Sequence, residues 1–107
     1  MAISVGATRQ ILADAYCTAG DWISVHTGAG AGSTGANEAT GGAPAYARKQ
    51  TVWATGANGV KTGSQVAVDL AAATYTGAGL WTAVTSGTFR DSASMTSTVL
   101  STQGQIL

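Results

Sequence analysis

The side chains in this chain that could carry out nucleophilic or acid–base chemistry are few. A single histidine, His26, could act as a general base for one of the serines, with an acidic side chain to orient it. His26 comes directly after an apolar run, however, and the chain contains no Gly-x-Ser-x-Gly turn that would expose a serine nucleophile. Asp21 is too close in sequence to be a long-range orienting group. We therefore interpret His26 as a structural or partner-contacting histidine, and we predict no catalytic residue and no enzymatic activity.

Metal and phosphate sites are not predicted either. The chain has one histidine, one cysteine (Cys17) and well-separated acidic residues, which give no recognised metal-ligand spacing. The glycine-rich run at residues 28–32 resembles a phosphate loop, but no Gly-Lys-Ser/Thr follows it and the chain does not pass directly into a helix pattern. We expect these glycines to provide flexibility and tight turns, and we expect no cofactor. Cys17 is interpreted as a small buried apolar residue.

The composition limits the class of partner. At 107 residues the chain forms one domain, with five basic residues, five acidic residues and a formal net charge of zero. This balance argues against nucleic acid and membrane surfaces as partners. It also weakens the self-repulsion that keeps monomers apart, so we expect a protein that works within an assembly.

The remaining global signals concern compartment and folding. A single cysteine cannot form an intrachain disulfide, and the first residues lack the basic start and apolar core of a signal peptide. No apolar run is long enough to predict a membrane span. We expect synthesis in the cytoplasm. Aromatic residues are spread along the whole chain, which predicts a folded domain despite the many Gly, Ala, Ser and Thr residues.

The hydrophobic pattern predicts one helix followed by strands. Ile11, Leu12 and Tyr16 have helical spacing over residues 8–18, with Thr8 as N-cap and a left-handed Gly20 as the terminator. The following run, Trp22–Thr27, has the β-branched and aromatic composition of a half-buried strand. It leads into a long glycine-rich loop, residues 28–43, and a loop of this length in a small domain indicates a contact surface or disorder.

Several turn signals divide the second half of the chain into strands. Pro44 belongs at the start of a strand, and Asn58-Gly59 predicts a hairpin between Val52 and Val66. Gly77 and Gly79 predict a bulge or a close backbone approach, and Ser86-Gly87 predicts another turn. The expected strands are residues 45–54, 63–70, 74–84, 88–90 and 94–102. Together they predict a mainly β fold, an antiparallel β-sandwich or jelly-roll-like domain with one short N-terminal helix.

The residues that we consider candidate subunit contacts come from the long loop, its flanking strands and two later positions. The aromatic residues fit either a core or an interface, and one of the basic residues could meet an acidic neighbouring subunit. The candidates are Trp22, His26, Asn37, Glu38, Tyr46, Arg48, Lys49, Trp81 and Arg90.

The order of these segments resembles a known family. The residues that carry the resemblance are 23–27, 35–38, 41–42 and 44–49, supported by Trp53, the Asn58-Gly59 turn and residues 80–82. The pattern resembles small virion proteins of tailed bacteriophages, especially those of actinobacteria, which are labelled capsid decoration, minor tail or tail fibre proteins. Members often have an acidic residue and a proline soon after the His-Thr pair, where this chain has glycines and alanines, so the start of its loop is expected to be looser.

The resemblance implies a structural role in the virion. Our leading hypothesis is a capsid decoration or minor capsid protein that binds the major capsid protein lattice as a homo-oligomer, with a homotrimer favoured. A minor tail or tail-fibre protein that contacts the host surface is the alternative. A carbohydrate-binding module, in which exposed tryptophans stack on sugar rings, and a small hydrolase remain as hypotheses from other classes.

Overall fold

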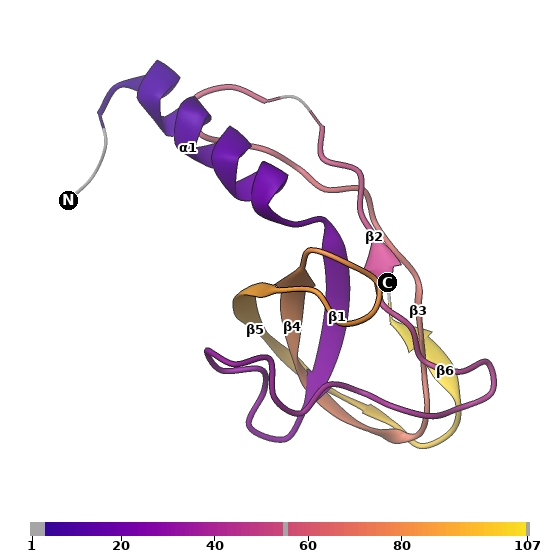
Figure 1. The fold of residues 1–107 in the computed structure, drawn as a ribbon. Helices are drawn as coiled ribbons and strands as arrows, with labels where there is room; N and C mark the ends of the chain where they lie inside the picture. The colour runs from indigo at the N-terminus through magenta and orange to yellow at the C-terminus, as the bar shows by residue number, and fades with distance from the viewer. Residues whose placement is uncertain (1–3, 55, 107) are drawn as a thin grey trace.

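The computed structural model describes residues 4–54 and 56–106, and within them it contains one helix and six strands (Figure 1). The helix is α1 (Gly6–Ala19), and the strands are β1 (Trp22–Thr27), β2 (Lys49–Gln50), β3 (Val68–Leu70), β4 (Ala73–Trp81), β5 (Phe89–Leu100) and β6 (Gly104–Ile106). All strand pairs are antiparallel. The mainly β fold with one short N-terminal helix is therefore confirmed.

The strands form two sheets around a small core. The four-stranded sheet has the order β2-β1-β4-β5, and β3 pairs with β6 in a separate two-stranded sheet. Buried side chains from both sheets meet in one cluster, whose members include Val25 of β1, Tyr75 of β4, and Val68 and Leu70 of β3. The predicted alternation over residues 66–70 is confirmed, since Val68 and Leu70 face this core.

The long loop completes the edge of β1. The short β2 covers only the first two residues of β1, Trp22 and Ile23. Farther along the same edge, Ala39 donates its N–H to the carbonyl of Val25, and Thr27 donates to the carbonyl of Asn37. The loop therefore supplies the hydrogen bonds that a longer edge strand would make, and it brings Ala39 into the core.

The strand predicted over residues 45–54 is mostly wrong. Only Lys49–Gln50 pairs with β1 as a strand. Beyond Gln50 the ladder ends because β1 begins at Trp22, and before Lys49 the edge of β1 is occupied by loop residues 37–39. The chain then leaves the sheet as an irregular hairpin beside α1 (Figure 1). Its Asn58-Gly59 turn is confirmed by positive φ angles of 58° and 87°, and Trp53 and Gly63 form an isolated antiparallel bridge. The hairpin is thus real, although its strands are not regular.

The later turns and strands follow the prediction in part. Ser86 and Gly87 both have positive φ, as their predicted turn requires, and the register shifts between Tyr75 and Gly77. The two strands predicted over residues 88–90 and 94–102 are a single strand, β5, because the intervening residues pair continuously with β4. The strand β6 was not predicted from the sequence.

The helix differs from the prediction at both ends. It begins at Gly6 with Val5 as N-cap, and no side chain caps it, so Thr8 lies inside the helix. Gly20 is extended rather than left-handed, with φ of −172°. A glycine is needed there because a Cβ atom would approach the carbonyl oxygen of Trp81 to 2.8 Å. Gly20 is therefore required by the close passage of β4 and not by the termination of the helix.

Gly79 gives a direct test of the predicted close approach in β4. A Cβ atom at this position would lie 2.8 Å from Nε2 of His26 and would also clash with Oγ of Ser24. We expect Gly79→Ala to lower the free energy of unfolding by about 2 kcal/mol in urea denaturation. Gly104→Ala is the matched control, because its Cβ would meet Leu100 at an ordinary 3.7 Å, and its effect should stay within about 0.5 kcal/mol. Equal effects of the two substitutions would contradict this account.

Candidate functional site

The most concentrated group of polar side chains surrounds an ion pair between the loop and the segment before β2. Nε of Arg48 donates to Oε2 of Glu38 at 2.8 Å, and Nη2 donates to Oε1 at 2.8 Å. The two parallel hydrogen bonds make a bidentate pair, the strongest geometry for these side chains. The side chain of Arg48 is 8% exposed and that of Glu38 is 21% exposed, so water screens this pair less than a surface pair.

Arg48 also reaches the turn that follows β4. Its Nη1 donates to the carbonyl oxygens of Ala83 and Ser86 at 3.0 and 2.9 Å. The guanidinium lies over the ring of Trp81, with Cζ 3.6 Å from the ring centroid, in a cation–π contact. One side chain thus joins the loop, the end of β4 and the following turn.

Tyr46 binds the same carboxylate and the backbone of β1. Its hydroxyl donates to Oε2 of Glu38 at 2.7 Å and accepts the N–H of Val25 at 3.3 Å. Burial, followed by the hydrogen bond to Glu38, raises the pKa of Tyr46, so the phenol remains a donor. Partial burial alone would raise the pKa of Glu38, but the hydrogen bonds from Arg48 and Tyr46 outweigh it and hold that pKa below its ordinary value.

A second part of the network lies under the loop on the other side of Trp81. Nε1 of Trp81 donates to Oγ of Ser24 at 2.9 Å, and Oγ of Ser24 lies 2.6 Å from Nε2 of His26. Nδ1 of His26 lies 2.7 Å from the carbonyl oxygen of Ala36. Because a carbonyl can only accept, we assign the proton to Nδ1, which leaves Nε2 to accept from the serine hydroxyl. Phe89 packs edge-on against Trp81 and closes the group.

The Ser24 and His26 pair has the spacing of a nucleophile and base but not their surroundings. Both residues are fully buried at 0% exposure, so no substrate reaches the hydroxyl. The group on Nδ1 is a backbone carbonyl rather than a carboxylate. Among the described residues, every buried side-chain nitrogen and oxygen has a hydrogen-bond partner. The arrangement therefore fixes the loop to the sheet and leaves no buried polar atom free for a ligand.

A hollow of about 280 Å³ lies beside the ion pair, between Glu38, Tyr46 and the turn that contains Val84 and Ser86. Both carboxylate oxygens of Glu38 already accept hydrogen bonds from Arg48, and Oε2 accepts a further one from Tyr46. The charge that lines the hollow is thus neutralised within the chain. The described part of the chain contains no cluster of three His, Cys, Asp or Glu side chains that could hold a metal ion. No helix in the described ranges is long and apolar enough to cross a membrane.

The nine candidate contact residues separate into internal and accessible positions. The structure corrects the interpretation of His26 and Arg48 as contacts, because both side chains are buried and bonded within the chain. Glu38, Tyr46 and Trp81 are half-buried and belong to the same network. The other four are the half-buried Trp22 and Lys49 and the exposed Asn37 and Arg90.

Sequence reasoning missed Ser24 as the partner of His26. The two residues are two positions apart in a strand, so their side chains lie on the same face, and this spacing was the available signal. For Arg48 the sequence left open a solvated side chain or a contact with an acidic neighbouring subunit, whereas its partner is Glu38 of the same chain. The loop folds back so that Glu38 lies beside Arg48, ten residues later in the chain. No local sequence pattern indicates this contact.

Comparison with known proteins identifies no relative for this chain: no protein-family model, no curated protein and no solved structure matches it.

A double-mutant cycle tests the ion pair. We expect Arg48→Met to destabilise the fold by about 3 kcal/mol, because it leaves the half-buried carboxylate of Glu38 without its main partner. Combined with Glu38→Gln, the coupling energy from chemical denaturation should be about 1 to 3 kcal/mol. The pair Lys61 and Asp14, 3.4 Å apart with Asp14 54% exposed, is the matched control and should couple by less than about 1 kcal/mol. Equal coupling in the two cycles would refute a special role for Arg48.

The lowered pKa of Glu38 predicts acid sensitivity. In the unfolded chain this carboxyl titrates near its ordinary value of 4.5, and in the fold it titrates at a lower pH. The stabilisation that it provides is therefore fully present above about pH 4.5 and is lost as the pH falls through the folded-state pKa. Thermal melts of the unaltered chain should show this acidic decline, and Glu38→Gln should be less stable at neutral pH but have a shallower decline. Parallel curves for the two proteins would contradict the assignment.

Proposed function

We propose that this chain is a non-enzymatic structural protein of a tailed bacteriophage virion, a capsid decoration or minor capsid protein that binds the major capsid protein lattice as a homo-oligomer. The resemblance described from the sequence supports the virion role and favours a homotrimer. The observation that supports a binding role is the different placement of two kinds of side chain. The side chains able to do chemistry are bonded to one another inside the fold, whereas large apolar side chains of α1 are exposed.

We further propose that the two sheets form the layers of a small β-sandwich. Their shared core supports this, because side chains of β1 and β4 meet those of β3 on one side of the larger sheet. In such a sandwich the loop and the N-terminal helix have exposed surface that can contact a neighbouring protein.

The loop is a contact surface that is already tied down in the single chain. Its backbone is bonded to β1, the hydroxyl of Thr76 donates to the carbonyl of Gly28, and the hydroxyl of Ser92 donates to that of Gly32. A loop held in this way loses less conformational entropy on binding than a disordered one. Its exposed tips, at residues 32–34 and 40–45, would then meet the shell as a formed surface.

The alternative location is the tail, where the same domain would contact a host surface. Exposed aromatic residues at loop tips would favour that role and would also favour a carbohydrate-binding module. Trp22, Trp53 and Trp81 are each half-buried. Trp53 and Trp81 are further engaged, through Nε1 of Trp53 to the carbonyl of Gly20 and through the contact of Trp81 with Arg48. These positions give the capsid location the better support.

Location in the particle tests the proposal. Antibody labelling of intact particles of the phage that encodes the chain, together with icosahedral reconstruction, should place it on the shell. Mixing of the purified chain with shells of the major capsid protein should give saturable binding. Label confined to the tail would replace the capsid role with the tail role, and absence from purified particles would refute a virion role.

An activity screen addresses the rival classes. We expect no turnover in a generic esterase screen and no reproducible ligand on a glycan array. Turnover that is lost in both His26→Ala and Ser24→Ala, with circular dichroism unchanged, would overturn the non-enzymatic assignment. A sugar ligand that is lost in Trp53→Ala without unfolding would favour a carbohydrate-binding module.

A further inference from the structure

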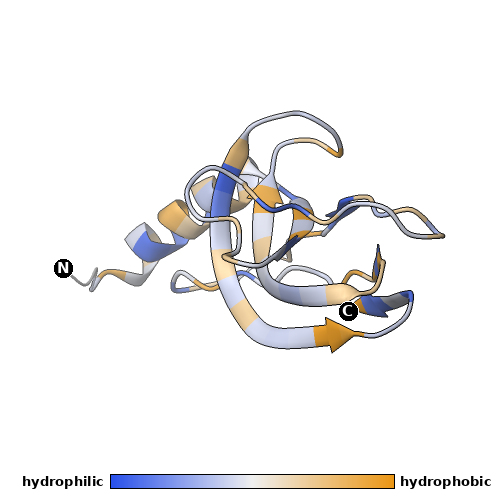
Figure 2. Cartoon of the chain, turned by 90° about the horizontal axis from the view of Figure 1, so that it is seen from below, coloured by the Kyte–Doolittle hydropathy of each residue, from blue (hydrophilic) through white to orange (hydrophobic). Residues whose placement is uncertain are grey.

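The apolar stripe of α1 points away from the body of its own chain. The inward face of the helix is formed by Gly6, Gln10, Ala13 and Cys17, and Oε1 of Gln10 accepts the N–H of Gly59 in the neighbouring hairpin. The outward face carries Ile11 at 67% exposure and Leu12 at 52%, and the N-cap residue Val5, just before the helix, is 58% exposed. Tyr16, which is 45% exposed, lies at the edge of this face beside β5. Figures 1 and 2 show that α1 projects from the strands and that hydrophobic residues lie along it.

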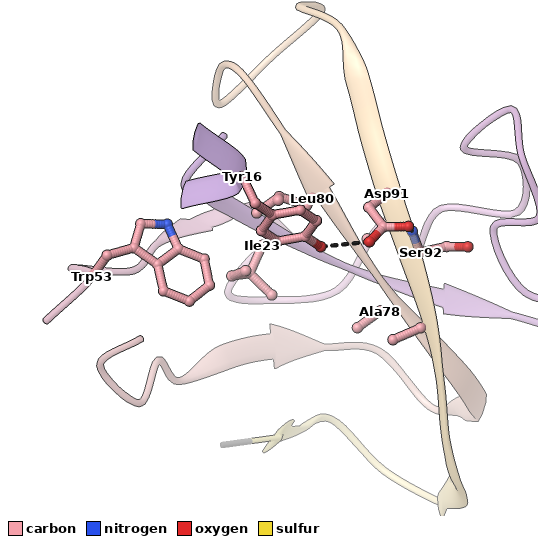
Figure 3. A pocket seen from close by; sticks show the side chains of 9 residues that line it. Tyr16, Ile23, Trp53, Ala78, Leu80, Asp91 and Ser92 are labelled. Atoms are coloured by element: carbon pink, nitrogen blue, oxygen red, sulfur yellow. Dashed lines mark hydrogen bonds between the residues drawn. The ribbon is translucent and has the colours of Figure 1, made fainter. Parts of the chain in front are cut away.

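An apolar groove adjoins the C-terminal end of this stripe. Its lining includes Ile23 of β1, Ala78 and Leu80 of β4, Ala93 of β5 and Trp53 of the hairpin, and Tyr16 of α1 belongs to both the stripe and the groove (Figure 3). The volume of the groove is about 130 Å³. This is close to the roughly 150 Å³ of a cavity that holds one benzene molecule, so one leucine or isoleucine side chain would fill it.

The charges beside this face are opposite at its two ends. Arg9 is exposed about two turns before Tyr16, which is roughly 10 Å along the helix. At the other end, the hydroxyl of Tyr16 donates to Oδ2 of Asp91, and this carboxylate lines the groove. If two such faces meet with their helices antiparallel, Arg9 of each copy comes next to Tyr16 and Asp91 of the other.

We propose that the occupant of this face is a second copy of the same chain, bound through an antiparallel pairing of the two α1 helices. The contact is reciprocal: Leu12 of each copy fills the groove of the other copy, and Arg9 of each copy meets Asp91 of the other. A twofold contact of this kind requires a self-complementary patch, and a stripe and a groove on one face provide it. The inference deepens the self-association in the proposed function and rests on that function, but it replaces the favoured homotrimer with a homodimer, because a reciprocal twofold contact closes with two copies.

The size of the face matches a modest interface. The stripe and the groove form one apolar face, and apolar patches that serve as interaction sites typically measure on the order of 500 Å² per copy. Two copies would bury about 1,000 Å², the lower limit for a specific interface. With a formal net charge of zero, little electrostatic repulsion opposes the approach of two copies. We therefore expect a reversible pair that forms at high local concentration, such as that on a shell.

Analytical ultracentrifugation over a micromolar to millimolar series tests the pair. The unaltered chain should shift reversibly from monomer to dimer, and Leu12→Glu should weaken the association at least about tenfold. Val99→Glu is the matched control, because Val99 is 70% exposed on β5, away from this face, and it should associate like the unaltered chain. Both variants should keep the unfolding free energy of the unaltered chain to within about 0.5 kcal/mol.

Charge reversal tests the antiparallel arrangement. Arg9→Asp and Asp91→Arg should each weaken the dimer, and the doubly reversed chain should regain most of the lost affinity, because the two charges again face their opposites across the interface. Circular dichroism and the melting temperature confirm that each variant is folded.

Three outcomes would overturn the inference: a monomer at every concentration, an assembly that Leu12→Glu leaves unchanged, or equal weakening by Val99→Glu. Failure of the double reversal to restore affinity would overturn the antiparallel arrangement. None of these measurements involves phage particles, so their failure is distinguishable from failure of the location experiment.

Discussion

The bidentate contact between Arg48 and Glu38 is the interaction on which the arrangement of the loop depends. It joins two segments that the loop separates, and Arg48 then extends the connection to Trp81 and to the turn after β4. Without it the loop would keep its backbone bonds to β1 but lose the side-chain link to the end of β4. A charged pair of such low exposure is retained only where its geometry is close to ideal, because desolvation opposes it.

The same contact also connects to the residue types that could do chemistry. Trp81 carries Arg48 on its ring and donates its N–H to Ser24, so the ion pair and the Ser24 and His26 pair form one continuous network. Every member is satisfied by another member or by the backbone, which gives rigidity rather than chemistry. What the fold leaves accessible is apolar surface on α1 and the polar tips of the loop. Both are suited to contact with other proteins.

Much of the fold could be predicted because its signals are local. The strand β1, the long loop and the turns at Asn58-Gly59 and Ser86-Gly87 follow from residue type and neighbours alone. The rest depends on distant parts of the chain. Gly20 is required by the carbonyl of Trp81, a contact that no sequence window contains. The site was only half predicted for the same reason: its residues were identified, but their partners were set by the return of the loop. The helical stripe was identified too, but sequence periodicity does not say whether a stripe faces inward.

The strand β5 has a consequence for how the protein must be produced. It lies at the border of the four-stranded sheet and is 12 residues long, and among the described residues it forms no backbone hydrogen bond of the kind that the loop makes with β1. Its charged side chains, Arg90 and Asp91, stand at its start, and serine, threonine and apolar residues occupy the remainder. Proteins usually guard such borders with lysine, proline or a short strand, because open backbone groups recruit strands from other molecules. In newly made chains, strand-to-strand aggregation through this edge therefore competes with folding.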